Sequence, residues 1–264
     1  MTVPVYIISL ASAQHRRAFQ KAQAQRLGFE PIWQAAVGVQ DFSDEEFLQQ
    51  AFRWQRPLKK TEVGCFLSHQ RVWQRIAASN GPAVVLEDDV ILADHWVSAV
   101  EALSQLQGLN FINLEAVGKK QLGESRICGS LTIQRLHLNS SGAGAYLVWP
   151  QAAQRLVQRA EQYGAALADA FINEARELHV WQLVPAIGIQ QCMLPYYGLP
   201  YEEEGASQIA RELHASAVPP SMSVAWGMRW RRLVGEFKKG VIKMGVLRGH
   251  RRQFVPYLTH QRHR

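Results

Sequence analysis

The chain has 264 residues, of which 47% are hydrophobic and 19% are charged. This composition supplies a substantial core and excludes a largely disordered chain. No apolar run reaches the roughly 18 to 20 residues of a membrane-spanning helix, and the first residues lack the pattern of a secretory signal, so we expect a cytoplasmic protein. Cys65, Cys128 and Cys192 form no C-x-x-C pair, which argues against a disulfide framework or a zinc knuckle.

Positive charge is concentrated at one end of the chain. The net charge is +7, yet residues 229–264 hold 11 Lys and Arg against the single acid Glu236. The rest of the chain is therefore mildly acidic. A general interpretation as a nucleic-acid-binding protein is weakened, because the basic character belongs to one segment.

Short β-rich runs alternate with helical stretches through the first half of the chain. The patterns predict strands at 5–10, 31–33, 83–86 and 110–114, a helix ending at Gly28, a Ser43-x-x-Glu46 capping box that opens a helix to Phe52, a Thr61-capped helix to about Ser79, and an Asp94-capped helix. Strands that alternate with helices indicate an α/β sheet, mostly parallel in this half.

The second half continues the mixed pattern. It predicts a hairpin over 127–138, a strand over 145–149, a helix that begins at Pro150, a helix over 169–178 and a strand over 180–185. The expected fold class is α/β, with a mixed, mostly parallel sheet and flanking helices.

Three consecutive acids, Glu87, Asp88 and Asp89, follow the apolar run 83–86. Burying an unpaired carboxylate is costly, and ligands of open α/β sheets collect at the carboxyl ends of strands. A divalent cation shared with a substrate diphosphate would offset the repulsion, and Mg²⁺ or Mn²⁺ suits carboxylates better than zinc does. The alternative is a solvated acidic turn.

Other candidate residues have two interpretations each. Arg16 and Arg17 follow the first strand, where guanidinium groups can meet a phosphate, yet paired arginines on an exposed helix are ordinary. His69 lies inside a predicted helix, where an isolated histidine is more often structural than catalytic. Neither a G-x-x-x-x-G-K-[ST] nor a G-x-G-x-x-G motif occurs.

Taken together, these segments resemble glycosyltransferase family 25, the bacterial lipooligosaccharide and lipopolysaccharide glycosyltransferases. The resemblance spans about residues 3–150 and rests on five blocks: V-Y-I-I-S-L at 5–10 with Arg16-Arg17, A-A-V-G at 35–38, E-V-G-C-F-L-S-H at 62–69, V-L-E-D-D-V at 85–90, and G-A-Y-L-V at 144–148. It implies a GT-A-like fold, a UDP-sugar donor, most often UDP-galactose, a lipooligosaccharide, lipopolysaccharide or other glycan acceptor, and inversion at the anomeric carbon.

The resemblance also implies roles for individual residues. Family members carry a D-x-D-type motif where this chain has Glu87-Asp88-Asp89, so the first acid is Glu here. Asp89 would hold Mn²⁺ or Mg²⁺, and Glu87 would lie near the ribose or assist the metal, while the role of Asp88 stays open. The residues expected around the donor are Arg16, Glu62, Ser68, His69, Glu87 and Asp88.

An inverting transfer needs a carboxylate to take the proton of the acceptor hydroxyl. We expect Asp169 to be this base, with helix capping as the alternative. Glu202, Glu203 and Glu204 form a second group of acids, although a charge run is usually a solvated face.

The predicted division of the chain is a GT-A-like domain over 1–215 and a basic amphipathic tail over 216–264. In the tail, Trp226, Trp230, Leu233, Phe237, Val241 and Met244 follow three- and four-residue steps, with Lys and Arg between them. This pattern is typical of a helix on an anionic membrane surface. We expect a peripheral protein on the inner face of the cytoplasmic membrane without a nucleic-acid partner, the alternative for the tail being a helix packed on the body by its aromatic stripe.

Two other functions stay open. In one, the basic tail binds nucleic acid and the acidic triplet is only a turn. In the other, the same carboxylates serve a metal-dependent phosphoesterase. The sequence favours the transferase over the phosphoesterase, because no histidine cluster accompanies the acids.

Overall fold

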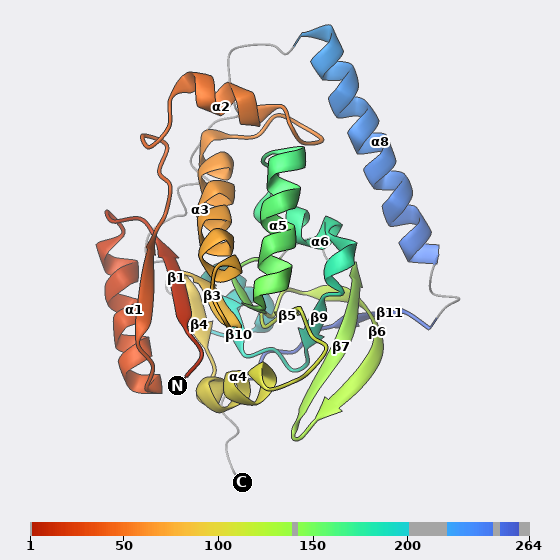
Figure 1. Ribbon diagram of the computed structural model, residues 1–264. Coiled ribbons are helices and arrows are strands. Elements are labelled where there is room, and N and C mark those ends of the chain that lie inside the picture. The colour runs from red at the N-terminus through yellow and green to blue at the C-terminus, as the bar shows by residue number, and fades with distance from the viewer. Residues whose placement is uncertain (1, 139–141, 201–220, 245–248, 259–264) are drawn as a thin grey trace.

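The computed structural model describes residues 2–138, 142–200, 221–244 and 249–258 (Figure 1). Its strands are β1 (Val5–Ser9), β2 (Pro31–Ala35), β3 (Ala83–Glu87), β4 (Val90–Leu92), β5 (Phe111–Asn113), β6 (Lys119–Cys128), β7 (Leu131–Leu138), β8 (Ala145–Val148), β9 (Trp181–Leu183), β10 (Gly188–Gln190) and β11 (Arg251–Phe254). Its helices are α1 (Gln14–Leu27), α2 (Asp44–Ala51), α3 (Lys60–Ala77), α4 (Trp96–Ser104), α5 (Pro150–Tyr163), α6 (Ala168–Glu174) and α8 (Met222–Met244), with 3-10 helices at Arg176–Leu178 and Gln191–Tyr197.

One sheet organises the described part of the chain. It is nine-stranded, in the order β11-β6-β7-β9-β5-β8-β3-β1-β2, and β4 and β10 form a separate two-stranded ribbon. The pairings make β2, β1, β3, β5, β9 and β6 point one way, and β8, β7 and β11 point the other way. The expected mixed sheet with most strands in one direction is confirmed.

Helices cover both faces of this sheet. Alternate residues of β3 show the two faces: Val85 packs in the core with α3, α5 and α6, whereas Val84 and Leu86 pack in the core with α1 and α4. Burial on both faces explains why the strand is a continuous apolar run instead of an alternating one. Figure 1 shows α3 and α5 side by side over the sheet.

Several local predictions are confirmed. Gly28 ends α1 in the left-handed conformation, with a φ of 76°, and Ser43 and Glu46 form the expected capping box of α2. Pro150 opens α5. Each of these signals acts within one helical turn, so the sequence is sufficient to show it.

Two predicted helix caps are wrong. The helix assigned to a Thr61 cap begins at Lys60, because Glu62 accepts the backbone N–H of Lys59 and fixes the cap two residues earlier. The helix assigned to an Asp94 cap begins at Trp96, and the Asp94 carboxylate instead pairs with Arg26. In both cases a neighbouring charged group competes with the cap.

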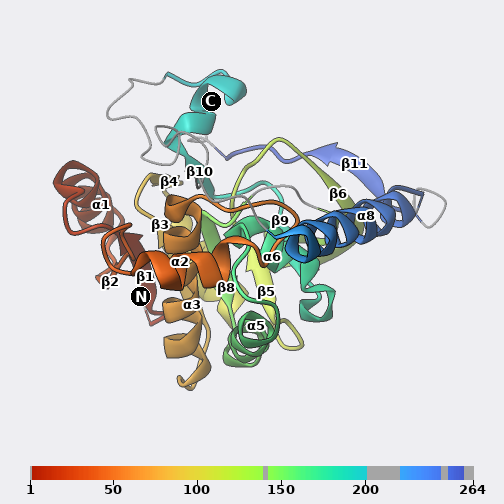
Figure 2. The ribbon, with the colours of Figure 1, turned by 90° about the horizontal axis from the view of Figure 1, so that it is seen from above.

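The described parts of the C-terminal region contact the body. β11 pairs antiparallel with β6 at the sheet edge, and Val255 is fully buried. α8 contacts the body through Arg231, which donates to the carbonyl oxygens of Phe52 and Trp54. Figures 1 and 2 show α8 running along one flank of the molecule. Part of the range 216–264 therefore belongs to the same body as the sheet.

The aromatic stripe of α8 faces away from the body. Trp226, Trp230 and Phe237 are 65%, 66% and 73% exposed, while Met228 on the opposite side is buried. The stripe therefore does not serve as the packing face of the helix. None of the helices among the described residues has the length and apolar character needed to span a membrane.

Candidate active site

The acidic triplet lies where β3, an interior strand of the sheet, ends. The backbone N–H of Glu87 donates to the carbonyl oxygen of Gly144 at 2.8 Å, which ties the strand end to the loop before β8. The chain then turns at Asp88 and Asp89 and enters β4. The three carboxylates thus occupy the carboxyl end of an interior strand, as predicted.

Both carboxylate oxygens of Asp88 accept hydrogen bonds from other side chains. Its Oδ2 accepts the hydroxyl of Ser9 at 2.8 Å, and its Oδ1 accepts Nη1 of Arg16 at 3.0 Å. Gln20 donates to its backbone oxygen at 3.1 Å. Asp88 therefore ties the turn to β1 and α1, and Arg16 is brought to the triplet as expected. These contacts hold the turn in place, and donor binding by Asp88 stays a prediction.

Asp89 carries the least satisfied carboxylate of the triplet. Its Oδ1 is buried and has no hydrogen-bond partner among the described residues. Burial, and then the charge of Glu87, raise the pKa of Asp89 to about 7, although Arg16 acts in the opposite direction. A buried carboxylate oxygen without a donor is unusual, because such groups are normally paired. A cation at this point would satisfy it.

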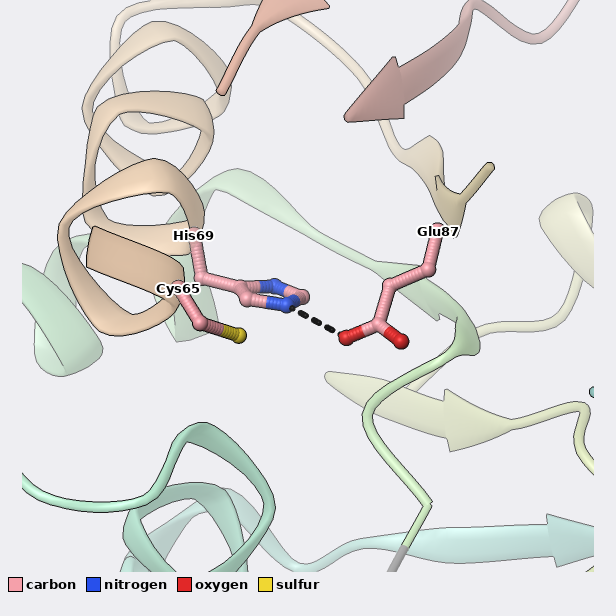
Figure 3. A group of neighbouring side chains, drawn as sticks. All are labelled: Cys65, His69 and Glu87. Atoms are coloured by element: carbon pink, nitrogen blue, oxygen red, sulfur yellow. Dashed lines mark hydrogen bonds and ion pairs between the residues drawn. The ribbon is translucent and has the colours of Figure 1, made fainter. Parts of the chain in front are cut away.

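Glu87 is oriented by two side chains. His69 on α3 lies with Nε2 at 3.2 Å from Oε1 of Glu87 (Figure 3), and Gln190 donates to Oε2 at 2.6 Å. The other nitrogen of His69, Nδ1, lies 2.9 Å from the hydroxyl of Tyr146, which also accepts the indole N–H of Trp73 at 2.9 Å.

His69 lies between a buried hydroxyl and a carboxylate. Tyr146 is fully buried, and its hydroxyl contacts Nδ1 of His69 and the indole nitrogen of Trp73. Both ring nitrogens of His69 are therefore engaged, and its ring is oriented toward Glu87, which the sequence alone did not show.

Cys65, His69 and Glu87 bring sulfur, nitrogen and oxygen atoms within 4.8 Å of one another (Figure 3). Such donors are typical of zinc sites. However, both nitrogens of His69 are already engaged. Burial, and then the charge of Glu87, raise the pKa of the Cys65 thiol well above its ordinary value, and metals bind the thiolate. This group is therefore not a prepared metal site.

Asp169 lies in the first turn of α6, which begins at Ala168. It is not the cap residue, because Leu167 precedes the helix. Its Oδ1 accepts the backbone N–H of Ala170 at 2.7 Å. Burial raises the pKa of Asp169, and the net shift is upward. The charge of Glu87 adds to this effect, whereas the bond from Ala170 and the charge of His69 oppose it. Asp169 thus lies within electrostatic reach of the triplet.

Glu62 and Ser68 make contacts at other points of α3. Glu62 accepts two bonds of 2.8 Å from Arg56; burial raises its pKa, but the bonds from Arg56 and from the backbone of Lys59 lower it overall. Ser68 donates to the carbonyl of Gly64 at 2.7 Å and accepts the N–H of Val37 at 2.8 Å. Donor binding by Glu62 and Ser68 stays a prediction. Residues 202–204 lie outside the described part of the chain.

Sequence reasoning missed Glu115. It is fully buried two residues after β5, its Oε2 accepts the N–H of Gly144 at 2.9 Å, and its Oε1 has no hydrogen-bond partner among the described residues. Burial raises the pKa of Glu115 to about 8, against the opposing charge of Lys120. The sequence did contain a pattern that could have identified Glu115, because this acid follows an apolar strand as Glu87 does.

The sheet with helices on both faces defines an α/β protein, and its acidic triplet lies at the carboxyl end of β3, the end at which open α/β sheets bind ligands. The sequence model of glycosyltransferase family 25 (LPS biosynthesis protein) matches residues 2–172, and the chain belongs to this family. The triplet, His69 and Asp169 all fall within the matched range.

Curated relatives share parts of the chain. A glycosyltransferase 25 family member of Aedes aegypti is 27% identical over 168 residues, which is 58% of this chain and 28% of the relative. One of Anopheles gambiae is 31% identical over 96 residues, 33% of this chain and 16% of the relative. A probable inactive glycosyltransferase 25 family member 3 of Rattus norvegicus is 39% identical over 71 residues, 25% of this chain and 12% of the relative. The chain spans less than a third of the length of these relatives.

Among solved structures, the glycosyltransferase GlyE of Streptococcus pneumoniae TIGR4 is 14% identical, with a TM-score of 0.35. The similarity covers 68% of this chain and 44% of that one.

Proposed function

We propose that the protein is an inverting, metal-dependent glycosyltransferase with a GT-A-like catalytic domain. It moves a hexose, galactose first and glucose second, from a UDP-sugar to a lipooligosaccharide, a lipopolysaccharide or another glycan. Family membership supports the reaction class. The observation that carries the proposal is the buried, unpartnered Oδ1 of Asp89 beside Glu87 at the end of β3.

The triplet fits a hard divalent cation. Mg²⁺ and Mn²⁺ in nucleotide sites use one or two carboxylates and take their other ligands from water and substrate phosphates. Asp89 would be the main ligand and Glu87 the second, since Asp88 is committed to Ser9 and Arg16. When bound, the cation neutralises charge on the departing diphosphate.

The residues of the chain supply positioning and proton transfer. Arg16 is fixed by Asp88 yet 30% exposed, so it can also contact a phosphate. The acceptor oxygen attacks the anomeric carbon, the bond from that carbon to the diphosphate oxygen breaks, and UDP leaves on the opposite face. Asp169 takes the acceptor proton, and the pKa raised by burial makes it a stronger base.

α8 supports a place for the enzyme at a membrane. Its stripe of Trp226, Trp230 and Phe237 is exposed, and Arg229 and Arg232 are exposed beside it. Aromatic anchors with cationic edges suit the anionic inner face of the cytoplasmic membrane, where each basic residue contributes about 1 kcal/mol. The outward stripe is therefore proposed to bind lipid.

Vesicle sedimentation tests the membrane contact. The wild-type chain should sediment with phosphatidylglycerol vesicles, and the triple variant Trp226→Ser, Trp230→Ser and Phe237→Ser should stay in solution with an unchanged melting temperature, because these side chains do not pack on the body. Equal sedimentation of both proteins would contradict the proposal.

Thermal shift tests the donor site. UDP-galactose or UDP-glucose with Mn²⁺ should raise the melting temperature of the wild-type protein, and neither should do so without the metal. Asp89→Ala should lose this response. The matched control Asp44→Ala, which changes an exposed acid on α2, should keep it. A response retained in Asp89→Ala would remove the triplet from the donor site.

A further inference from the structure

A polar pocket is present whose described lining includes no residue of the acidic triplet. Its volume is about 130 Å³, and it is formed by β7, by the end of α6 with the following 3-10 helix, and by α8. α8 packs against β7 at this point, on the flank seen in Figure 1. The polar groups that line it are Arg135, His137, Asn173 and Arg176, and Ile242 of α8 closes it.

Arg135 supplies an unused donor. Its Nη1 is buried and has no hydrogen-bond partner among the described residues. Burial lowers the pKa of Arg135, and the charge that opposes this effect comes from Glu124, an exposed residue of β6. A buried guanidinium N–H without an acceptor is costly, and its geometry matches the oxygens of a phosphate.

The neighbouring groups add donors without adding negative charge. Arg176 is exposed and reaches the carbonyl oxygen of Lys238 at 3.5 Å with one nitrogen. Asn173 uses one amide hydrogen on the carbonyl oxygen of Asp169 at 2.7 Å, which leaves its second hydrogen. The described lining contains no Asp or Glu.

The acids Glu174 of α6 and Glu177 of the 3-10 helix are paired with an arginine outside the pocket. Glu174 and Glu177 lie 3.9 and 3.7 Å from Arg159. His137 stacks on His250 at 3.5 Å between ring centroids. Burial, and then the charges of His250 and Arg135, lower the pKa of His137 to about 4. His137 is therefore uncharged near pH 7, and the positive charge of the pocket comes from its two arginines.

We propose that this pocket binds a phosphate group. Within the proposed function, on which this part rests, the phosphate is carried by the acceptor. Asn173 and Asp169 are four residues apart on α6, so a bound phosphate lies along the same helix as the proposed base. α8 closes the pocket with Ile242 and turns its aromatic stripe outward. A phosphorylated glycolipid in a membrane has a phosphate for the pocket and a lipid surface for the aromatic stripe.

Isothermal titration with inorganic phosphate, against chloride at equal ionic strength, tests the pocket directly. The wild-type chain should bind phosphate, and Arg135→Gln should weaken the affinity at least roughly tenfold, the effect of losing one charge-assisted hydrogen bond. Arg176→Gln, which changes an exposed side chain, is a second variant if Arg135→Gln is poorly folded. Arg252→Gln, an exposed arginine of β11 outside the pocket, should bind like the wild type.

Vesicles distinguish the source of the phosphate. If it belongs to a lipid headgroup, Arg135→Gln lowers binding to phosphatidic acid vesicles and leaves binding to phosphatidylglycerol vesicles unchanged. If it belongs to the glycan, Arg135→Gln lowers binding of inorganic phosphate alone, and both vesicle types bind equally. Either result supports the pocket.

Absence of phosphate binding by the wild-type protein, or equal binding by Arg135→Gln and Arg252→Gln, overturns the proposal. Failure of the donor site has a different signature, because the response to UDP and Mn²⁺ depends on Asp89 and not on Arg135.

Discussion

Asp89→Asn should stabilise the metal-free protein and at the same time abolish its response to UDP and Mn²⁺. Folding takes Asp89 from an ordinary pKa of 3.8 to about 7, a difference equivalent to about 4 kcal/mol at 1.36 kcal/mol per pKa unit. Asp89 keeps partial contact with solvent, and the new amide is itself unpartnered. We therefore expect a net gain of about 1–3 kcal/mol at pH 8.

The contribution of Asp89 to the free energy of unfolding depends on pH. The carboxyl of the unfolded chain ionises near 3.8, whereas that of the folded chain stays protonated until about pH 7. The folded state binds the extra proton in this interval, so the contribution of Asp89 to stability falls as the pH rises from 3.8 to about 7 and is constant above it. The gain from Asp89→Asn should be small at pH 4 and complete at pH 8.

Urea unfolding in EDTA at both pH values measures this difference. Asp88→Asn is the matched control with the opposite sign, because Asp88 accepts bonds from Ser9 and Arg16, and it should lose about 2–3 kcal/mol. If Asp89→Asn were as destabilising as Asp88→Asn at pH 8, the carboxylate of Asp89 would have a partner in the folded protein, and the reasoning would be refuted.

Two further substitutions test the structure around the site. Gly64→Ala places a Cβ 2.4 Å from the carbonyl oxygen of Val37, whereas Gly81→Ala meets nothing within 4 Å; urea unfolding should show a loss of about 1–3 kcal/mol for the first alone, and similar stabilities would contradict the close approach. Tyr146→Phe leaves the buried N–H of Trp73 without its acceptor and should cost about 2–3 kcal/mol, while the exposed Tyr163→Phe should be neutral in the same assay; a neutral Tyr146→Phe would contradict the hydrogen-bond chain to His69.

The sequence predicted most of the elements and the position of the triplet, because each depended on a local signal. The apolar run 83–86 is buried on both faces, and Gly28 and the capping box at Ser43 act within one turn. The carboxyl end of the strand was then enough to locate Glu87 and its neighbours.

What the sequence could not show depends on contacts between distant segments. Asp88 and Asp89 are equivalent acids in the sequence, and they differ because Ser9 and Arg16 reach only Asp88 with hydrogen bonds. β11 reads as a basic tail, yet it pairs with β6 more than a hundred residues away. The burial of Lys120 could not be predicted from the sequence, since the fold supplies the three oxygens that accept bonds from its ammonium group.

Electron paramagnetic resonance of Mn²⁺ is the most direct test of the central claim, that the unpartnered carboxylate of Asp89 completes a cation and diphosphate site. With UDP present, the wild-type protein should convert the sharp signal of free Mn²⁺ into the broad signal of the bound ion, and Asp89→Asn should leave the sharp signal unchanged. Equal conversion by both proteins would contradict the account.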